Sequence, residues 1–313
     1  MSLRPLAGTV VSYDAPSTEE IARRTGLPVS KIVRFDGNTS PQLLPSTRLE
    51  ALEEELARVH TYPHGGYPRL EEAIADYAGV STDNLVLGAG ADDLILLVVR
   101  AFAGAGDFVA IANEPTYPLF SIAAWVAGAE IGDERPSLTI CCRPNNPTGE
   151  LGPLPTARPL LVDEAYFEYS GETALDLIDD DVIVLRTFSK AFALAGARVG
   201  YAVAGREIAG ALRGRQHPAP LSTLSAALAL AALASPPDVG PILHERERLG
   251  RRLRELGFEP WPSHGNFLFV PVDRPEELSE RLMRAGLPVR PVPGGIRITI
   301  RNEEDDERLL QAL

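Results

Sequence analysis

The sequence contains little lysine and cysteine and no long hydrophobic run, and each scarcity excludes a class of protein. Lysine occurs at only two positions, 31 and 190, so arginine supplies almost all of the 30 basic side chains. The two cysteines, Cys141 and Cys142, are adjacent, which excludes a disulfide framework, and we expect both to be small buried residues at a strand end. Because no apolar run could span a bilayer and the N-terminus lacks a signal-peptide stretch, we expect a cytoplasmic protein with no membrane partner.

Positive charge is also in deficit. The chain has 43 acidic residues against 30 basic ones, and its formal net charge is −13. This balance argues against the basic footprint of a nucleic-acid-binding protein. An anionic ligand would instead have to be held by local arginines.

The hydrophobic pattern indicates an α/β fold. With 313 residues, 45% of them hydrophobic, the chain can bury a large core. From residue 85 onward, short apolar segments alternate with helical or loop stretches, which favours a mostly parallel central sheet. The expected strands of this sheet are 85–87, 108–111, 138–142, 160–162, 182–185 and 200–203. A smaller α+β unit should follow, with strands at 266–270 and 296–300.

Helices are expected where apolar residues recur at helical spacing between capping residues. The first expected helix, 17–25, has Ser17 as its N-cap and is followed by Gly26. The others are 47–59, 70–77, 92–102, 221–233, 242–256 and 275–285. These elements predict three parts: an N-terminal arm and small-domain element over 1–34, a large domain over 35–217 and a small C-terminal domain over 218–313.

The helix expected at 242–256 has an apolar stripe formed by Leu249, Leu253 and Leu256. Arginines such as Arg248 lie mostly off this stripe, interleaved with glutamates such as Glu245. Alternating charges of this kind indicate a solvated helix face rather than a polyanion site.

Lys190 is the candidate nucleophile. It follows the apolar run 181–185, in a chain that otherwise uses arginine for its positive charge. A guanidinium stays protonated and forms no imine. A desolvated amine with cations nearby can lose its proton well below its usual pKa of about 10.4 and then attack an aldehyde such as that of pyridoxal phosphate.

Two further segments have the composition of ligand-binding loops. Residues 88–93 follow a strand and open a helix, the geometry that binds phosphate, although a plain tight turn explains the glycines equally well. The phosphate-binding interpretation of 88–93 is strengthened by Lys190 and Arg198, because all three could surround one phosphorylated aldehyde. Asp163 and Glu164 end a buried strand, where a carboxylate can keep a pyridine nitrogen protonated, although a helix cap or loop anchor is the simpler reading.

The order of these segments resembles a known family. The matching segments are 88–93, 115–117, 145–149, 163–166, 187–190 and 196–201. Together they are similar to the fold-type I pyridoxal-phosphate aminotransferases, in the histidinol-phosphate aminotransferase branch. The resemblance covers residues 13 to about 301 and implies a central sheet with helices on both faces in the cofactor-binding domain.

The resemblance assigns roles around the cofactor ring. Lys190 would attach pyridoxal 5'-phosphate covalently, and Asp163 would pair with the pyridine nitrogen. Asn146 and Tyr166 would hydrogen-bond the phenolic oxygen of the ring, and Tyr117 would stack on it. By composition alone, Tyr117 is equally well a packing aromatic, and 143–149 is a turn.

The resemblance also assigns the cofactor phosphate. The expected contacts within one chain are the backbone of Gly90, Ala91 and Asp92, the hydroxyls of Thr187 and Ser189, and Arg198. Tyr62 would reach in from a second subunit, which implies a homodimer with shared active sites. Without the resemblance, Tyr62 would be a simple turn aromatic.

Substrate binding is assigned to residues of both domains. Arg297 would grip the substrate α-carboxylate with its two-pronged donor geometry, whereas its strand position alone favours a surface-facing side chain. Arg290 and Tyr13 would lie near a distal phosphate, although Arg290 by itself is an exposed loop cation. Asn38 would contact substrate, in a segment (35–41) that departs from the family pattern.

The chain departs from the family pattern in two other ways. Ala219 stands where the family has a tyrosine, and the intervals 117–145 and 149–163 are shorter than in the family.

The activity that the resemblance implies is transfer of the amino group between L-histidinol phosphate and 2-oxoglutarate, in histidine biosynthesis. An aromatic amino acid aminotransferase and a threonine-phosphate decarboxylase are the alternatives. A non-catalytic sensing module would need a DNA-binding region, and no such segment is present.

Overall fold

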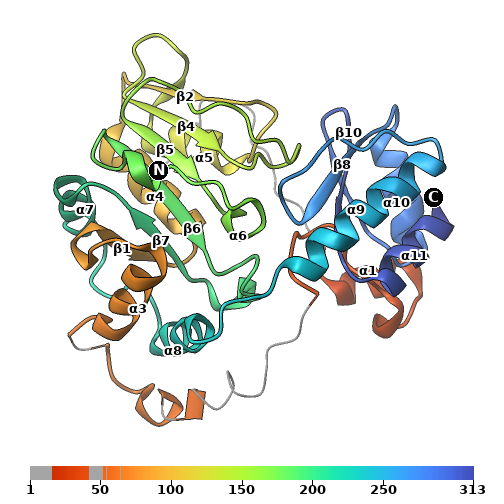
Figure 1. The fold of residues 1–313 in the computed structure, drawn as a ribbon, viewed down its shortest axis with the longest axis horizontal. Coiled ribbons are helices and arrows are strands. Elements are labelled where there is room, and N and C mark those ends of the chain that lie inside the picture. Colours follow the sequence, from red (N-terminus) through yellow and green to blue (C-terminus); the bar gives the residue numbers. More distant parts are fainter. Residues whose placement is uncertain (1–15, 42–51, 54, 64) are drawn as a thin grey trace, which may run out of the picture.

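The computed structural model describes residues 16–41, 52–53, 55–63 and 65–313. These residues form two lobes, one built on a seven-stranded sheet and the other on a three-stranded sheet (Figure 1). No helix within this part of the chain is long and apolar enough to cross a membrane. Tyr13 and much of the helix expected at 47–59 lie outside the described residues, although 52–53 and 55–58 are helical.

The large sheet confirms the predicted mostly parallel architecture. Its strand order is β1-β7-β6-β5-β4-β2-β3. The five strands from β6 to β3 are parallel, whereas β7 is antiparallel to both of its neighbours. The strands are β1 (Leu85–Gly88), β2 (Phe108–Ile111), β3 (Glu130–Ile131), β4 (Leu138–Cys142), β5 (Leu160–Asp163), β6 (Val182–Thr187) and β7 (Gly200–Val203).

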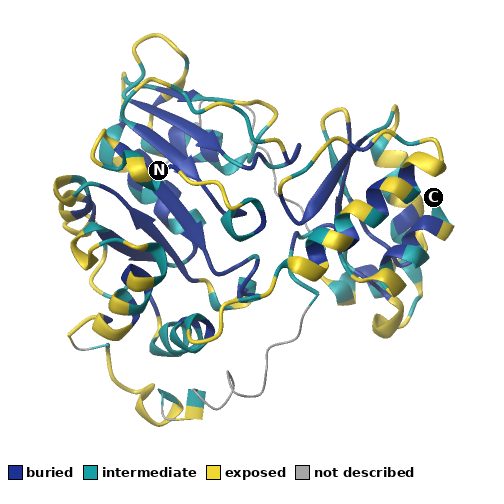
Figure 2. Ribbon diagram, viewed as in Figure 1, coloured by how far each residue is buried: buried dark blue, intermediate teal, exposed yellow. Residues whose placement is uncertain are grey.

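Helices cover both faces of this sheet, as the resemblance implied. On one face, α4 (Ala91–Phe102), α5 (Leu119–Ala127) and α7 (Arg206–Arg213) share a hydrophobic core with alternate strand residues. On the other, α3 (Pro68–Ala78) and α8 (Thr223–Leu233) pack with residues of β1 and β7. On that same face, β4, β5 and β6 are covered by Leu154 and by residues 174–178, so these strands are buried along their length, as their mostly apolar sequences indicate (Figure 2).

Short helices complete the chain between these elements. They are α6 (Phe167–Ser170) and the 3₁₀ turns η1 (Val29–Lys31), η2 (Thr82–Asn84), η3 (Leu175–Leu177) and η4 (Ala195–Ala197). The shortened interval 149–163 contains no helix, so β4 reaches the parallel strand β5 through turns and irregular chain. The sheet is nevertheless continuous across this connection.

The small lobe combines C-terminal and N-terminal segments. Its sheet, in the order β8-β10-β9, is antiparallel. Phe35 forms a parallel bridge with Val289, so the chain around residue 35 belongs to this lobe. The elements are α1 (Thr18–Thr25), α9 (Gly240–Glu255), β8 (Phe267–Pro271), α10 (Pro275–Arg284), β9 (Arg290–Val292), β10 (Gly295–Thr299) and α11 (Glu303–Ala312).

The structure confirms the predicted caps of α1 and the burial of the two cysteines, but it places α8 elsewhere. Ser17 caps α1 by accepting a hydrogen bond from the Glu20 amide, and Gly26 ends it, as expected. Both cysteines are buried. Helix α8 was assigned to the small C-terminal domain, but it packs on α3 in the core of the large sheet.

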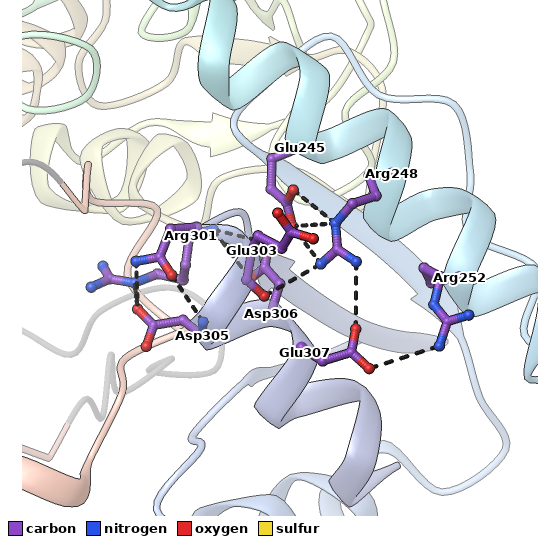
Figure 3. A network of polar contacts seen from close by, with 9 residues as sticks. Glu245, Arg248, Arg252, Arg301, Glu303, Asp305, Asp306 and Glu307 are labelled. Carbon is purple, nitrogen blue, oxygen red and sulfur yellow. Dashed lines mark hydrogen bonds and ion pairs between the residues drawn. The ribbon is translucent and has the colours of Figure 1, made fainter.

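The expected stripe and solvated face of α9 are partly wrong. Leu249 and Leu253 are fully buried, but Leu256 is 49% exposed because it lies beyond the last helical turn. Glu245, assigned to the solvated face, is only 7% exposed. It lies where α11 packs on α9, and Arg248 donates to both of its carboxylate oxygens at 2.9 Å (Figure 3).

Glu245 faces a second buried acid, Asp306 of α11, which has no exposed surface (Figure 3). The Arg301 amide donates to the two Asp306 oxygens at 3.3 and 3.4 Å. Burial, together with a hydrogen bond to the Glu245 carboxylate, raises the pKa of Asp306 far above its usual range. The Asp306 carboxyl therefore holds its proton to higher pH in the folded protein than in the unfolded chain.

We predict that Asp306→Asn flattens the pH dependence of stability. Because the pKa of Asp306 is higher in the folded than in the unfolded chain, its contribution to stability falls as pH rises above about 4. An asparagine amide donates to Glu245 at every pH. The Tm of Asp306→Asn should therefore decline less than that of the wild type between pH 5 and 8. Thermal unfolding checks this, with exposed Glu304→Gln as the control; parallel declines would contradict it.

Candidate active site

The candidate active site lies at the carboxyl ends of the parallel strands, on the side of the large sheet that faces the small lobe (Figure 1). Asp163 is the last residue of β5, and Thr187 is the last residue of β6. Lys190 follows β6 in the next turn. Because neighbouring parallel strands end at the same edge, their terminal side chains converge there.

The Lys190 amine lies between the two lobes. Its Nζ donates to the carbonyl oxygen of Gly37 at 3.4 Å and lies 5.7 Å from the centroid of the Tyr166 ring. Burial, together with the positive charge of Arg297, lowers the pKa of Lys190 to about 8. A considerable fraction of the amine is therefore neutral and nucleophilic near physiological pH.

Asp163 is 4% exposed and accepts a hydrogen bond from the Ala165 amide at 3.0 Å. Burial raises the pKa of this carboxyl to about 7, and the nearby Asp92 adds to the shift, whereas Lys190 opposes it. A buried carboxylate is stabilised in its ionised form by a cationic partner. A protonated pyridine nitrogen would lower its pKa again and keep it ionised.

Backbone and hydroxyl groups form a cup beside Lys190. Gly90 caps the N-terminus of α4, where the helix dipole favours an anion. The hydroxyl of Thr187 donates to the Ser189 Oγ at 2.9 Å, and the Arg198 guanidinium donates to the same Oγ at 3.4 Å. This set of donors fits a phosphate monoester.

Gly200 is required by the close packing under this cup. A Cβ on Gly200 would lie 2.8 Å from the carbonyl carbon of Gly90 and 2.9 Å from the amide nitrogen of Ala91. Both neighbours are backbone atoms, which have little freedom to move. The glycine therefore lets β7 support the turn that forms the cup.

Asp92 has a contact that the sequence did not predict. Only its backbone was expected to bind phosphate, but its carboxylate accepts from Arg198 at 2.9 Å and from the Tyr117 hydroxyl at 3.0 Å. Tyr117 also packs edge-to-face on Phe120, with ring centroids 5.8 Å apart. Asp92 thus fixes two side chains assigned to the cofactor.

Arg297 comes from the small lobe and is 5% exposed, so the surface-facing alternative is wrong. Its NH1 donates to the Asn146 side-chain oxygen at 2.6 Å, and its NH2 donates to the Asp36 carbonyl at 2.5 Å. Asn146 belongs to the large lobe. Arg297 therefore connects the two lobes at the point where Lys190 lies.

The turn at 145–149 makes a second connection between the lobes. Asn145 is buried and donates to the carbonyl of Pro115 and to the Thr148 hydroxyl, both at 3.0 Å. The carbonyl of Gly149 accepts from the His264 amide at 2.8 Å. Gly149 has φ 81°, and a Cβ there would lie 2.3 Å from the Ser263 Oγ, so only glycine fits.

Of the three remaining predicted site residues, the structure describes Arg290 and Tyr62. Arg290 lies on β9 directly opposite Arg297 on β10, so the two arginines share one face of the small sheet. Tyr62 is 78% exposed and lines a groove of about 1250 Å³ with residues of α3 and α8; Lys190, Asp163 and Arg198 do not line it. Tyr13 lies outside the described residues.

Asn38 and the two carbonyls before it also contact site residues. Asn38 is 1% exposed and hydrogen-bonds to Tyr166, while Asp36 and Gly37 offer carbonyl oxygens to Arg297 and Lys190. Sequence reasoning missed the carbonyl contacts. A backbone acceptor has no residue-type signature, so no signal in this segment could have identified them.

Comparisons with known proteins agree with this geometry. The family model for aminotransferase class I and II matches residues 30–133 and 129–313. The histidinol-phosphate aminotransferase of Thermococcus kodakarensis is 36% identical over 87% of this chain and 89% of its own, and that of Caldanaerobacter subterraneus subsp. tengcongensis is 32% identical over 90% and 92%.

A solved structure has the same fold. The crystal structure of histidinol-phosphate aminotransferase from Sinorhizobium meliloti in complex with pyridoxal-5'-phosphate superimposes with a TM-score of 0.87 at 27% identity. The alignment covers 97% of this chain and 94% of that one. The extent of the family match and the similarity of the curated relatives leave one conclusion: the chain belongs to the class I and II aminotransferases.

Proposed function

We propose that this protein is a pyridoxal-phosphate-dependent aminotransferase that transfers the amino group between L-histidinol phosphate and 2-oxoglutarate, as a step of histidine biosynthesis in the cytoplasm. The observation that carries the proposal is the half-buried Lys190, whose amine contacts the Gly37 carbonyl at the junction of the two lobes and has its pKa lowered to about 8. The names of the curated relatives support the substrate, and the pyridoxal 5'-phosphate in the Sinorhizobium meliloti enzyme supports the cofactor.

The donors at the strand ends fit this cofactor. Bound pyridoxal phosphate supplies an electron sink for the charge left when a bond to the substrate Cα breaks. Asp163 lies buried beside Lys190, where its carboxylate can hold a proton on the pyridine nitrogen. The cup formed by Gly90, Ser189 and Arg198 can hold the phosphate.

The chain's own groups then divide the work. Lys190 Nζ would attach the cofactor, and as a free amine it would take the proton from the substrate Cα. Arg297 binds the carboxylate of 2-oxoglutarate through its planar fork, giving up its contacts with Asn146 and Asp36. Arg290, on the same face of the small sheet, adds the positive charge that a substrate phosphate requires.

Replacing Lys190 tests the activity directly. Lys190→Arg keeps the charge but cannot attach the cofactor, so we expect loss of the visible absorbance of the bound cofactor and a fall in turnover of at least roughly 10³-fold. Glutamate formed from 2-oxoglutarate and L-histidinol phosphate is the measurement. Lys31→Arg, at the exposed second lysine, is the matched control.

Two results would contradict the proposed reaction. One is a Lys190→Arg variant that retains wild-type turnover. The other is release of carbon dioxide from threonine phosphate without consumption of 2-oxoglutarate, which would favour a decarboxylase. Both results can be measured with turnover assays on purified protein.

Arg290 should discriminate between phosphorylated and unphosphorylated substrates. A charge-assisted hydrogen bond to a phosphate contributes about 1.5–3 kcal/mol, so Arg290→Ala should lower kcat/KM for L-histidinol phosphate by roughly 10- to 100-fold. The loss with phenylalanine should be much smaller. Arg274→Ala, an exposed arginine of the same lobe, is the control. Equal losses with both amines would rule out the assignment and favour an aromatic substrate.

We also propose a homodimer with shared active sites, in which Tyr62 of one subunit reaches the cofactor phosphate of the other. Leu56 and Val59 are 56% and 59% exposed and lie on the same stretch as Tyr62. Three large apolar side chains exposed together favour a surface that another protein covers.

Mixed dimers test this arrangement. Tyr62→Ala should weaken cofactor binding about tenfold through loss of one phosphate contact. A dimer of one Tyr62→Ala and one Lys190→Arg subunit contains one intact site, so at cofactor concentrations too low to saturate Tyr62→Ala, co-expression should give activity that neither variant has alone. Light scattering should give twice the 33.7 kDa chain mass. A monomer, or mixed subunits without restored activity, would refute shared sites.

A further inference from the structure

The segment 35–38 extends from the small sheet to the reactive residues. Phe35 is fixed in the small lobe, since its amide donates to the Pro288 carbonyl and its carbonyl accepts from the Thr299 amide. The next two carbonyls contact Arg297 and Lys190. The backbone of Asn38 remains bonded to the small lobe, through Thr299 and Asn266, while its Nδ2 donates across to the Tyr166 hydroxyl of the large lobe at 3.0 Å.

Thr299 fixes the orientation of the Asn38 amide. The Asn38 backbone N–H donates to the Thr299 Oγ1 at 2.9 Å, and the Thr299 hydroxyl donates to the Asn38 Oδ1 at 3.0 Å. If the amide were flipped, the fully buried Thr299 hydroxyl would lose its only acceptor within the described part of the chain. An unsatisfied buried donor costs about 1–3 kcal/mol, so Nδ2 faces Tyr166.

This orientation determines where the Tyr166 proton points. The Tyr166 oxygen accepts from Asn38, so its own proton is directed away from Asn38. Tyr166 is 2% exposed, and its ring is held edge-to-face on Phe267 at a centroid distance of 5.0 Å. Burial raises the pKa of Tyr166, so the phenol keeps its proton. A phenol that accepts one hydrogen bond is a stronger donor of its own.

We propose that Asn38 is a positioning residue, which directs the Tyr166 proton toward the ring oxygen of the cofactor, rather than a substrate contact. The inference rests on the cofactor contact assigned to Tyr166 under the proposed function. It gives Thr299 and Asn38, both in the small lobe or attached to it, control over a hydrogen bond made in the large lobe. Tyr166 then stabilises the ionised ring oxygen.

Two substitutions of Asn38 distinguish the loss of its hydrogen-bond donor from a reversal of its polarity. Asn38 has φ 50°, a conformation that aspartate and glycine both tolerate. Asn38→Gly removes the donor. Asn38→Asp keeps the size of the side chain but reverses its polarity, since a carboxylate only accepts and would draw the Tyr166 proton toward itself.

The readouts are the Kd for pyridoxal phosphate and the pH midpoint of the visible absorbance of the bound cofactor. We expect the Kd to rise several-fold in Asn38→Gly and at least roughly tenfold in Asn38→Asp, since hydrogen bonds to charged groups contribute about 1.5–3 kcal/mol. The pH midpoint should rise in the same order, because the ionised ring oxygen loses a donor.

A Tyr166→Phe background distinguishes positioning from general stability. There the cofactor has no phenol to lose, so Asn38→Gly should leave the Kd and the pH midpoint almost unchanged. A purely structural Asn38 would change both equally in the two backgrounds. That result, or an Asn38→Asp protein that matches the wild type, would overturn the proposal.

A wrong substrate assignment would leave the expected results of these measurements unchanged. These measurements use cofactor binding and not turnover, so they hold for any amine substrate. If the wild type shows no visible absorbance that depends on Lys190, the cofactor contact of Tyr166 falls and this proposal falls with it.

Discussion

Removal of the Lys190 amine from water is the constraint on which the candidate site depends. A fully solvated lysine would be protonated and unreactive at neutral pH. Here the small lobe closes over the amine and adds the positive charge of Arg297, while Asp92 and Asp163 limit the shift by favouring the charged form. The opposing charges hold the amine near the point where it can either carry or release a proton.

The same balance of charges explains why the site needs both lobes. The large sheet brings Asp163, Thr187 and Lys190 together because β5 and β6 end side by side. The one cation on these two strands, Arg186 of β6, is buried and paired with Glu164. The small sheet supplies the cation for a substrate anion, Arg297, and the contact with Asn146 links that arginine to the loop after β4.

Much of the fold follows from sequence because its signals are local. Buried apolar runs stop at the ends of strands, and this signal placed Asp163 and Lys190 at strand ends. The bounds of α1 follow from its capping residues. β3 was missed because two exposed residues carry no alternation to detect. The burial of Glu245 was missed because its partner, Asp306, is distant in sequence.

Other features depend on long-range contacts that no local pattern encodes. Helix α8 is apolar on all sides apart from Thr223 and Ser225 in its first turn, so its sequence does not say which lobe it joins. The carbonyls of Asp36 and Gly37 reach the site only because the N-terminal segment returns to pair with the small sheet. The resemblance supplied the role of Arg297, for which the strand position alone suggested a solvent-facing side chain.

The contact that Gly149 makes with the small lobe has a consequence for the position of Arg297. The Gly149 carbonyl accepts from the His264 amide, and a Cβ on Gly149 would collide with Ser263, at a place where chain from one lobe meets chain from the other. Asn146, in the same turn, holds Arg297. A side chain at residue 149 would therefore press on the small lobe close to Arg297, so the space left by one missing Cβ helps to keep the anion-binding fork in place.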